Sequence, residues 1–142
     1  MKDVIKKEIW SFFKKTQPVY FATIDTDIPR VRPVTLIYFN EKFWIATGSE
    51  DSKMLQIRTN CNFEFCCSIS DDNNMGYIRG AGDITIIKDV DTKKILLDNI
   101  DFISHFWKDP ADLGYSLLQL NIKEIEYLKI GEMIANKYEY NE

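Results

Sequence analysis

Residues 30–53 read RVRPVTLIYFNEKFWIATGSEDSK, and this stretch decides the expected fold. It contains two β-rich runs, Arg30–Phe39 and Phe43–Thr47, which are joined by the tight connection Asn40-Glu41. Because so short a connection joins antiparallel neighbours, the two runs predict a hairpin. The polar residues that follow the second run lead into a short predicted helix. Residues 30–53 therefore predict two paired strands and a helix directly after them.

The rest of the chain continues this pattern on both sides. Alternating and β-branched runs predict further strands, at Val19–Asp25, Phe63–Ser70, Met75–Ile87, Tyr115–Ile122 and Glu124–Ile130. Apolar spacing of three and four residues predicts helices at Met1–Lys15, Ser52–Thr59 and Asp91–Phe106. Asp51 or Ser52 is expected to cap the second helix, and Asp91 or Thr92 the third. The polar C-terminal residues predict a short helix or a frayed tail.

Two glycines, Gly80 and Gly82, interrupt the long strand Met75–Ile87. Glycine inside a strand usually marks a bulge or a sharp bend, as the corners of a barrel require. Six or seven antiparallel strands with short connections predict a mainly β fold, a closed or nearly closed barrel with helices outside it. The strand pattern alone does not separate this barrel from a sandwich.

Composition narrows the classes of partner. The chain has 142 residues and a net charge of -4, from 18 basic and 22 acidic residues. This balance argues against a nucleic-acid partner, which needs a concentrated basic surface. No apolar run approaches the ~20 residues that span a bilayer, so we expect no membrane insertion. Without a linker or an internal repeat, residues 1–142 are expected to form one domain.

The cysteines indicate a reducing compartment. Cys61, Cys66 and Cys67 are an odd number, two of them are adjacent, and no signal peptide is evident, so we expect a cytoplasmic protein. There is no C-x-x-C pair, and the single histidine, His105, lies far along the chain. A metal site is therefore not expected.

Cations and hydroxyls gather at the ends of the two strands of residues 30–53. Arg30 and Arg32 are two positions apart in a strand, so they share a face. A phosphate dianion would stabilise two such neighbouring arginines, and Lys53 and the free N–H groups of the following helix add further donors. Thr47 and Ser52 supply hydroxyls. Each residue taken alone fits a solvated surface better than a binding site, and only the combination favours a site for an organic phosphate.

Pro33 lies in the same strand and has no N–H group to donate. The strand is therefore expected to be an edge, or to be interrupted, at this point. An interruption leaves backbone groups of neighbouring residues free to bind a planar heterocycle. A simple edge strand guarded by proline is the other interpretation, and both stay open.

Several motifs together resemble the pyridoxamine 5′-phosphate oxidase-like, FMN-binding split-barrel family. They are RVRPV at Arg30–Val34, WIAT at Trp44–Thr47, the spacing from Thr47 to Ser52-Lys53, and YIRGAGD at Tyr77–Asp83. The order of the elements also matches. The resemblance implies a six- to seven-stranded antiparallel split β-barrel with two to four peripheral helices. It further implies a homodimer that holds FMN in two equivalent clefts at its interface.

The resemblance also implies which residues bind the cofactor. The phosphate contacts would come from Arg30, Arg32 and Lys53, with Thr47 and Ser52 as hydroxyl donors and Gln56 as a weaker candidate. Backbone around Pro33–Val34 and Ile45–Ala46 would face the edge of the isoalloxazine. The pattern does not decide which arginine makes the direct contact.

One departure from the family bears on the reaction. The authentic oxidases carry tryptophan- and arginine-containing segments near the C-terminus, whereas this chain has no arginine after Arg79 and ends in KYEYNE. We therefore do not expect pyridoxamine phosphate oxidation. The resemblance implies hydride or electron transfer between NAD(P)H and a small acceptor, with a non-catalytic flavin, heme or deazaflavin module as the alternative. No catalytic residue is identified, and His105 is expected to be structural.

Overall fold

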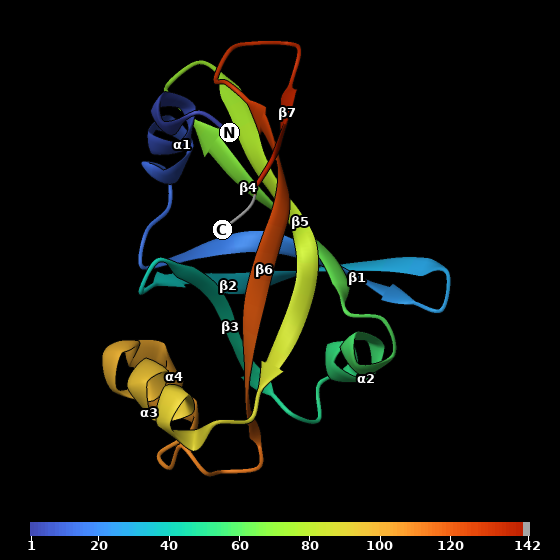
Figure 1. Ribbon diagram of the computed structural model, residues 1–142, viewed down its shortest axis with the longest axis vertical. Helices are drawn as coiled ribbons and strands as arrows, with labels where there is room; N and C mark the ends of the chain where they lie inside the picture. The colour runs from blue at the N-terminus through green and yellow to red at the C-terminus, as the bar shows by residue number, and fades with distance from the viewer. Residues whose placement is uncertain (141–142) are drawn as a thin grey trace.

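The computed structural model describes residues 1–140, in which seven strands and four helices are formed (Figure 1). The strands are β1 (Thr16–Asp25), β2 (Ile28–Phe39), β3 (Lys42–Gly48), β4 (Asn62–Ser70), β5 (Met75–Ile87), β6 (Tyr115–Leu128) and β7 (Asn136–Glu139). The helices are α1 (Asp3–Trp10), α2 (Ser52–Thr59), α3 (Val90–Asn99) and α4 (Asp101–Phe106).

Six of these strands close into an antiparallel barrel. Their order is β3-β2-β1-β4-β5-β6, and β3 pairs back onto β6. The long strand β6 makes this closure possible, since its first half pairs with β3 and its second half with β7. The expectation of a mainly β barrel with peripheral helices is confirmed.

Two apolar clusters hold the barrel and its helices together. The first fills the barrel with inward-facing side chains, among them Phe21, Phe43 and Phe65, and α1 covers one end of it with Ile9. The second lies outside, where α3 and α4 pack on β2, β3 and β6; it consists of Ile37, Trp44, Leu96, Ile100, Ile103, Tyr115 and Leu117. Where the two clusters lie on either side of a strand, both of its faces are buried, as at Leu36 and Ile37 of β2.

A bulge lies at the predicted glycine interruption of β5. The pairing of β5 with β6 shifts between Ala81 and Gly82, which leaves Lys123 without a partner in the register. A Cβ atom at Gly82 would overlap the Asn121 carbonyl oxygen, and one at Gly80 would meet the Phe65 ring at 2.6 Å. Both glycines thus allow a close approach that a side chain would prevent.

The predicted helices need three corrections. The first ends at Trp10 rather than Lys15, because 3₁₀-type bonds after it turn the aromatic side chains of residues 12 and 13 toward the barrel. The predicted helix Asp91–Phe106 is two helices, since Ile100 has extended backbone and is fully buried between them. The cap of α3 is Asp89, whose carboxylate accepts from the first N–H groups of the helix.

The C-terminal strands also differ from the prediction. Tyr115–Ile122 and Glu124–Ile130 are one strand, β6, which runs through the bulge at Lys123. Of the C-terminal residues, Asn136–Glu139 form β7 instead of a helix or frayed tail, and the part of that prediction that falls on residues 141–142 lies outside the described residues. In both cases pairing with a distant strand overrides the local polar pattern.

The described residues contain neither a membrane-spanning helix nor a metal cluster. No helix within residues 1–140 is long and apolar enough to cross a membrane. The same residues bring no three His, Cys, Asp or Glu side chains together as a metal site would require. All three cysteines are free thiols.

Candidate functional site

Helix α2 is held firmly at the end of β3, and it positions the candidate site. Its N-terminus is capped by Asp51, whose carboxylate accepts from the Lys53 N–H at 3.1 Å. Met54 and Ile57 are buried in the barrel cluster, so this face of the helix cannot turn away. Lys53 and Gln56, which begin and end one helical turn, are thereby fixed beside β1 and β2.

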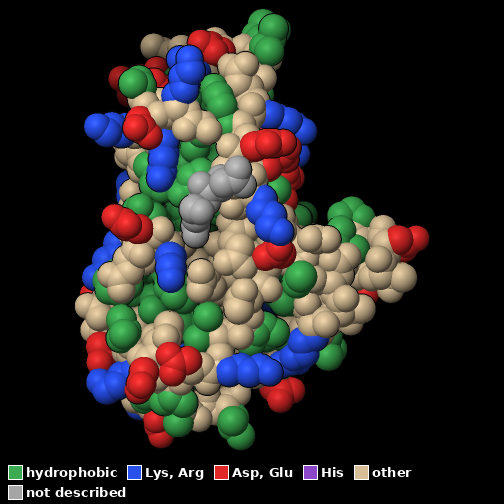
Figure 2. Space-filling view, in the orientation of Figure 1, with side chains coloured by type: hydrophobic (Ala, Val, Ile, Leu, Met, Phe, Trp, Pro, Cys, Tyr) green, Lys and Arg blue, Asp and Glu red, His purple; other side chains and the backbone are tan. Residues whose placement is uncertain are grey.

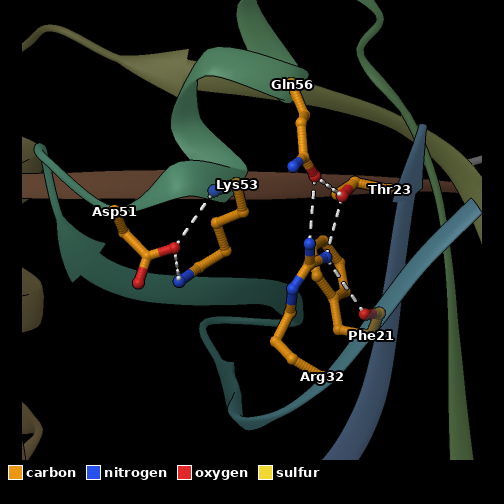
Figure 3. Close-up of polar contacts among 6 residues, drawn as sticks. All are labelled: Phe21, Thr23, Arg32, Asp51, Lys53 and Gln56. Carbon is orange, nitrogen blue, oxygen red and sulfur yellow. Dashed lines mark hydrogen bonds and ion pairs between the residues drawn. The ribbon is translucent and has the colours of Figure 1, made fainter. Parts of the chain in front are cut away.

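Arg32 is the centre of a polar group that joins two strands and this helix (Figure 3). Its guanidinium donates to Thr23 Oγ1 at 2.8 Å, to Gln56 Oε1 at 3.0 Å and to the Phe21 carbonyl at 3.2 Å. The Thr23 hydroxyl donates to the same Gln56 oxygen at 2.6 Å. These contacts hold the guanidinium plane in one orientation.

The environment of Arg32 leaves it a partly buried cation. Burial lowers the pKa of its guanidinium, and the negative charge of Asp51 raises it again in part. An arginine stays protonated at any pH at which the protein is studied. The site therefore keeps a fixed positive charge.

Lys53 is the second cation of the site. Its side chain is only 7% exposed, and its ammonium pairs with Asp51 Oδ1 at 3.1 Å. Burial acts to raise the pKa of the Asp51 carboxyl, but hydrogen bonds from Lys53 and the charges of Lys53 and Arg32 outweigh it and lower that pKa. Asp51 is therefore an anion at neutral pH.

Arg30 lies apart from these two cations. It shares a face with Arg32, as expected, but it stands on the hairpin of β1 and β2 that projects from the body (Figure 1). Its Nε atom pairs with Asp25 Oδ2 at 3.2 Å, and both side chains are about half exposed, 50% and 44%. The structure thus brings Arg32 and Gln56 into contact, places Lys53 one turn earlier on α2 in an ion pair with Asp51, and leaves Arg30 on the hairpin.

The two predicted hydroxyl donors both precede Lys53 in the chain. Thr47 is buried near the end of β3, opposite Ser116 of β6. Ser52 is the exposed first residue of α2. Neither hydroxyl bonds the Arg32 group.

The backbone positions predicted to face a heterocycle lie where β2 and β3 diverge. The two strands pair only from Ile37 to Phe39 of β2, whereas β3 pairs with β6 from Phe43 to Gly48. Pro33 and Val34 therefore have β1 on one side and no described strand on the other, so β2 is locally an edge, as predicted. On β3, Ile45 and Ala46 likewise lack β2 as a partner. The side chain of Ile45 is buried in the barrel, and Ala46 packs on the outer cluster.

Sequence reasoning missed Thr23 and saw Asp51 only as a cap. Thr23 is 1% exposed and faces the barrel together with Val19 and Phe21. A polar residue at an inward position of an otherwise apolar strand face was a usable signal, because buried polar groups need partners. Asp51 lies only two residues before Lys53, so their ion pair could also have been expected from the sequence.

Comparison with known proteins places the fold. No family model matches the sequence, and no curated protein matches it. Among solved structures, general stress protein 26 from Bacillus anthracis str. Sterne has a TM-score of 0.75 and 18% identity, over 96% of this chain and 98% of that one. A protein from Clostridium acetobutylicum, related to general stress protein 26 and described as pyridoxinephosphate oxidase family, has a TM-score of 0.73 and 17% identity, over 96% and 93%.

The chain has the pyridoxamine 5′-phosphate oxidase-like split-barrel fold. A heme-binding protein from Mycobacterium smegmatis shares this split barrel, with a TM-score of 0.73 and 10% identity; 88% of this chain matches 53% of that one. Identities this low demonstrate the fold alone. The function of this split barrel must be argued from its site.

Proposed function

We propose that this split barrel binds FMN, with the phosphate held between Arg32 and Lys53 at the start of α2. The observation that carries the proposal is that α2 is linked to both cations: its Gln56 holds the Arg32 guanidinium, and its Lys53, one turn earlier at the capped N-terminus, has a nearly buried ammonium (Figure 3). Guanidinium and ammonium groups are the usual donors to phosphate, and helix N–H groups add to them. The residues present therefore fit the phosphate of a flavin nucleotide.

The surroundings of this pair of cations fit the rest of the cofactor. Thr47 at the end of β3 and Ser52 directly before Lys53 can add hydroxyl donors. The strand edges at Pro33–Val34 and Ile45–Ala46 have free backbone groups, which suit the polar rim of an isoalloxazine. Gln56 orients the Arg32 guanidinium, and we do not expect it to contact the ligand itself.

A bound FMN supplies hydride and electron transfer, and we propose that the chain is an oxidoreductase acting between NAD(P)H and a small acceptor. The residues of the chain bind and orient the cofactor. A non-catalytic flavin-binding module is the second candidate. It is favoured because the described site residues, Thr23, Arg32, Asp51, Lys53 and Gln56, include no histidine or cysteine. His105 is exposed on α4, which packs on the outer cluster.

Titration of the purified protein with FMN and with riboflavin tests the proposal. We expect FMN to bind about 100-fold more tightly than riboflavin, because riboflavin lacks the phosphate and with it two charge-assisted contacts. Perturbation of the visible flavin spectrum gives both dissociation constants. Turnover of NADH or NADPH by the loaded protein separates the oxidoreductase from the binding module. Absence of FMN binding would contradict the proposal. Heme binding would then be tested by the appearance of a Soret band.

We further propose a homodimer that forms through the outward face of β1 and β2, on the other side of these strands from Arg32. The outward face of β1 and β2 exposes Tyr20 and Val31, 58% and 68% accessible, next to Pro33. Figure 2 shows the hairpin that carries part of this face standing clear of the body. Exposed apolar side chains gathered on one sheet face are typical of an interaction surface.

Val31→Glu tests this face. Two copies of the new carboxylate would meet across a two-fold interface, and we expect the dimer dissociation constant to rise at least about tenfold. Sedimentation velocity measures the change. Leu113→Glu is the matched control, because Leu113 is 92% exposed on the loop before β6, away from the proposed face. A wild-type protein that is monomeric at every concentration would rule the dimer out.

A further inference from the structure

A carboxylate sits inside the proposed phosphate site. Asp51 Oδ1 lies 3.1 Å from the Lys53 backbone nitrogen and 3.1 Å from its ammonium. Asparagine and serine cap helices as well as aspartate does. Capping of α2 therefore accounts for a side chain with an acceptor oxygen at position 51, but it does not require that side chain to be charged.

The Asp51 carboxylate is already paired with Lys53, the cation that a ligand phosphate would need. Lys53 is nearly buried, and among residues 1–140 its ion pair is with Asp51, which is 45% exposed. Figure 3 shows the Lys53 ammonium turned to Asp51, while the Arg32 guanidinium faces Thr23 and Gln56. A phosphate that bridges Lys53 and Arg32 has to displace the carboxylate or bind next to it.

We propose that Asp51 is a specificity-determining residue that competes with the ligand phosphate for Lys53 and so limits the affinity for phosphate dianions. The inference rests on the proposed FMN site. With Asp51 ionised, two cations face one resident anion, and a dianion leaves the site with an excess negative charge. The preference for a phosphorylated flavin over an uncharged one is therefore smaller than Arg32 and Lys53 alone would produce.

Asp51 stays charged over the whole working range of pH. Despite its partial burial, the contacts with Lys53 and the charge of Arg32 lower the pKa of its carboxyl. Neutralising it therefore requires a substitution. Asp51→Asn is nearly isosteric and keeps the cap, so α2 should retain its N-terminus.

The test compares wild type and Asp51→Asn in titrations with FMN and riboflavin. We expect the variant to bind FMN about tenfold more tightly, the scale of removing one half-screened charge beside a dianion. Riboflavin affinity should not change, because riboflavin has no phosphate. Asp25→Asn is the matched control, since Asp25 pairs with Arg30 on the hairpin and its loss changes the net charge by the same amount.

The outcomes separate the inference from the function on which it rests. An unchanged or weaker FMN affinity in Asp51→Asn, beside clear FMN binding by wild type, overturns the role of Asp51 and leaves the flavin site standing. An equal gain for FMN and riboflavin also overturns it, since the gain would not depend on the phosphate. If neither protein binds FMN, the proposed function fails and this inference fails with it. Thermal unfolding of both proteins verifies that α2 is intact.

Discussion

Arg32→Ala is expected to weaken FMN binding by about 2 kcal/mol, or roughly 30-fold, which is the scale of removing one charge-assisted hydrogen bond from a partly buried site. The guanidinium is held by Thr23, Gln56 and the Phe21 carbonyl, so its donors are oriented before any ligand arrives. Donors oriented in advance lose little entropy when the ligand binds. Spectroscopic titration with FMN measures the effect.

Arg30→Ala is the matched control for this prediction. Arg30 is the same residue type on the same strand face, but it lies on the hairpin, half exposed and paired with Asp25. We expect its removal to change FMN affinity by no more than about twofold, since exposed ion pairs contribute little. Equal decreases of FMN affinity in both variants would show that Arg32 has no special role in binding the phosphate. An unchanged affinity in Arg32→Ala would mean that the phosphate binds away from Arg32. Because removal of Arg32 leaves Thr23 and Gln56 with fewer partners, the unfolding midpoint of each variant must be measured beside its affinity.

The parts of the fold that local chemistry determines were predictable. The Asn40-Glu41 connection has positive φ at both residues, 53° and 60°, as a two-residue hairpin turn requires. Helix α2 begins and ends as predicted, because its cap and its apolar positions lie within its own sequence. The irregularity at the glycines of β5 was likewise predictable, since glycine in a strand usually marks a bulge or bend, although the extra residue is Lys123 of β6.

The parts that depend on distant partners were not predictable. Helical spacing continues through Ile100, and only its burial between two helices and the barrel explains the break there. Lys123 looks like the end of a strand, yet β6 continues past it because β5 pairs on both sides of the bulge. β7 has a polar sequence and exists through its pairing with β6.

The candidate site shows the same division. Alternation along a strand correctly put Arg30 and Arg32 on one face, but it carries no information on where β2 leaves the body of the protein. That position follows from the pairing of β1 with β4, which covers only Tyr20–Ala22, so Arg32 lies opposite a residue inside this pairing and Arg30 lies where the hairpin extends past β4. The hydrogen bond of Thr23 with Gln56 joins residues far apart in the chain and could not be read from either segment.

Gly82→Ala is expected to lower the free energy of unfolding by about 3 kcal/mol, at the upper end of what overpacking costs. The bulge brings the Asn121 carbonyl oxygen against the Cα atom of Gly82, and an added Cβ would overlap that oxygen. The obstacle is backbone, and the neighbouring side chains Asn121 and Lys123 are tied to Asp83. Relief therefore requires β5 and β6 to separate at the bulge. Denaturant unfolding of the purified variant measures the change.

Gly48→Ala is the control that isolates the steric cause of this destabilisation. Gly48 ends β3, and a Cβ atom there would meet no heavy atom within 4 Å. Since its φ is not in the left-handed region, alanine should be neutral or slightly stabilising, by up to about 1 kcal/mol, through the unfolded chain. Similar destabilisation in both variants would show that glycine flexibility, rather than the close approach at the bulge, stabilises the barrel. An unchanged stability of Gly82→Ala would mean that the two strands separate at little cost, and the bulge would then be no constraint on closure of the barrel.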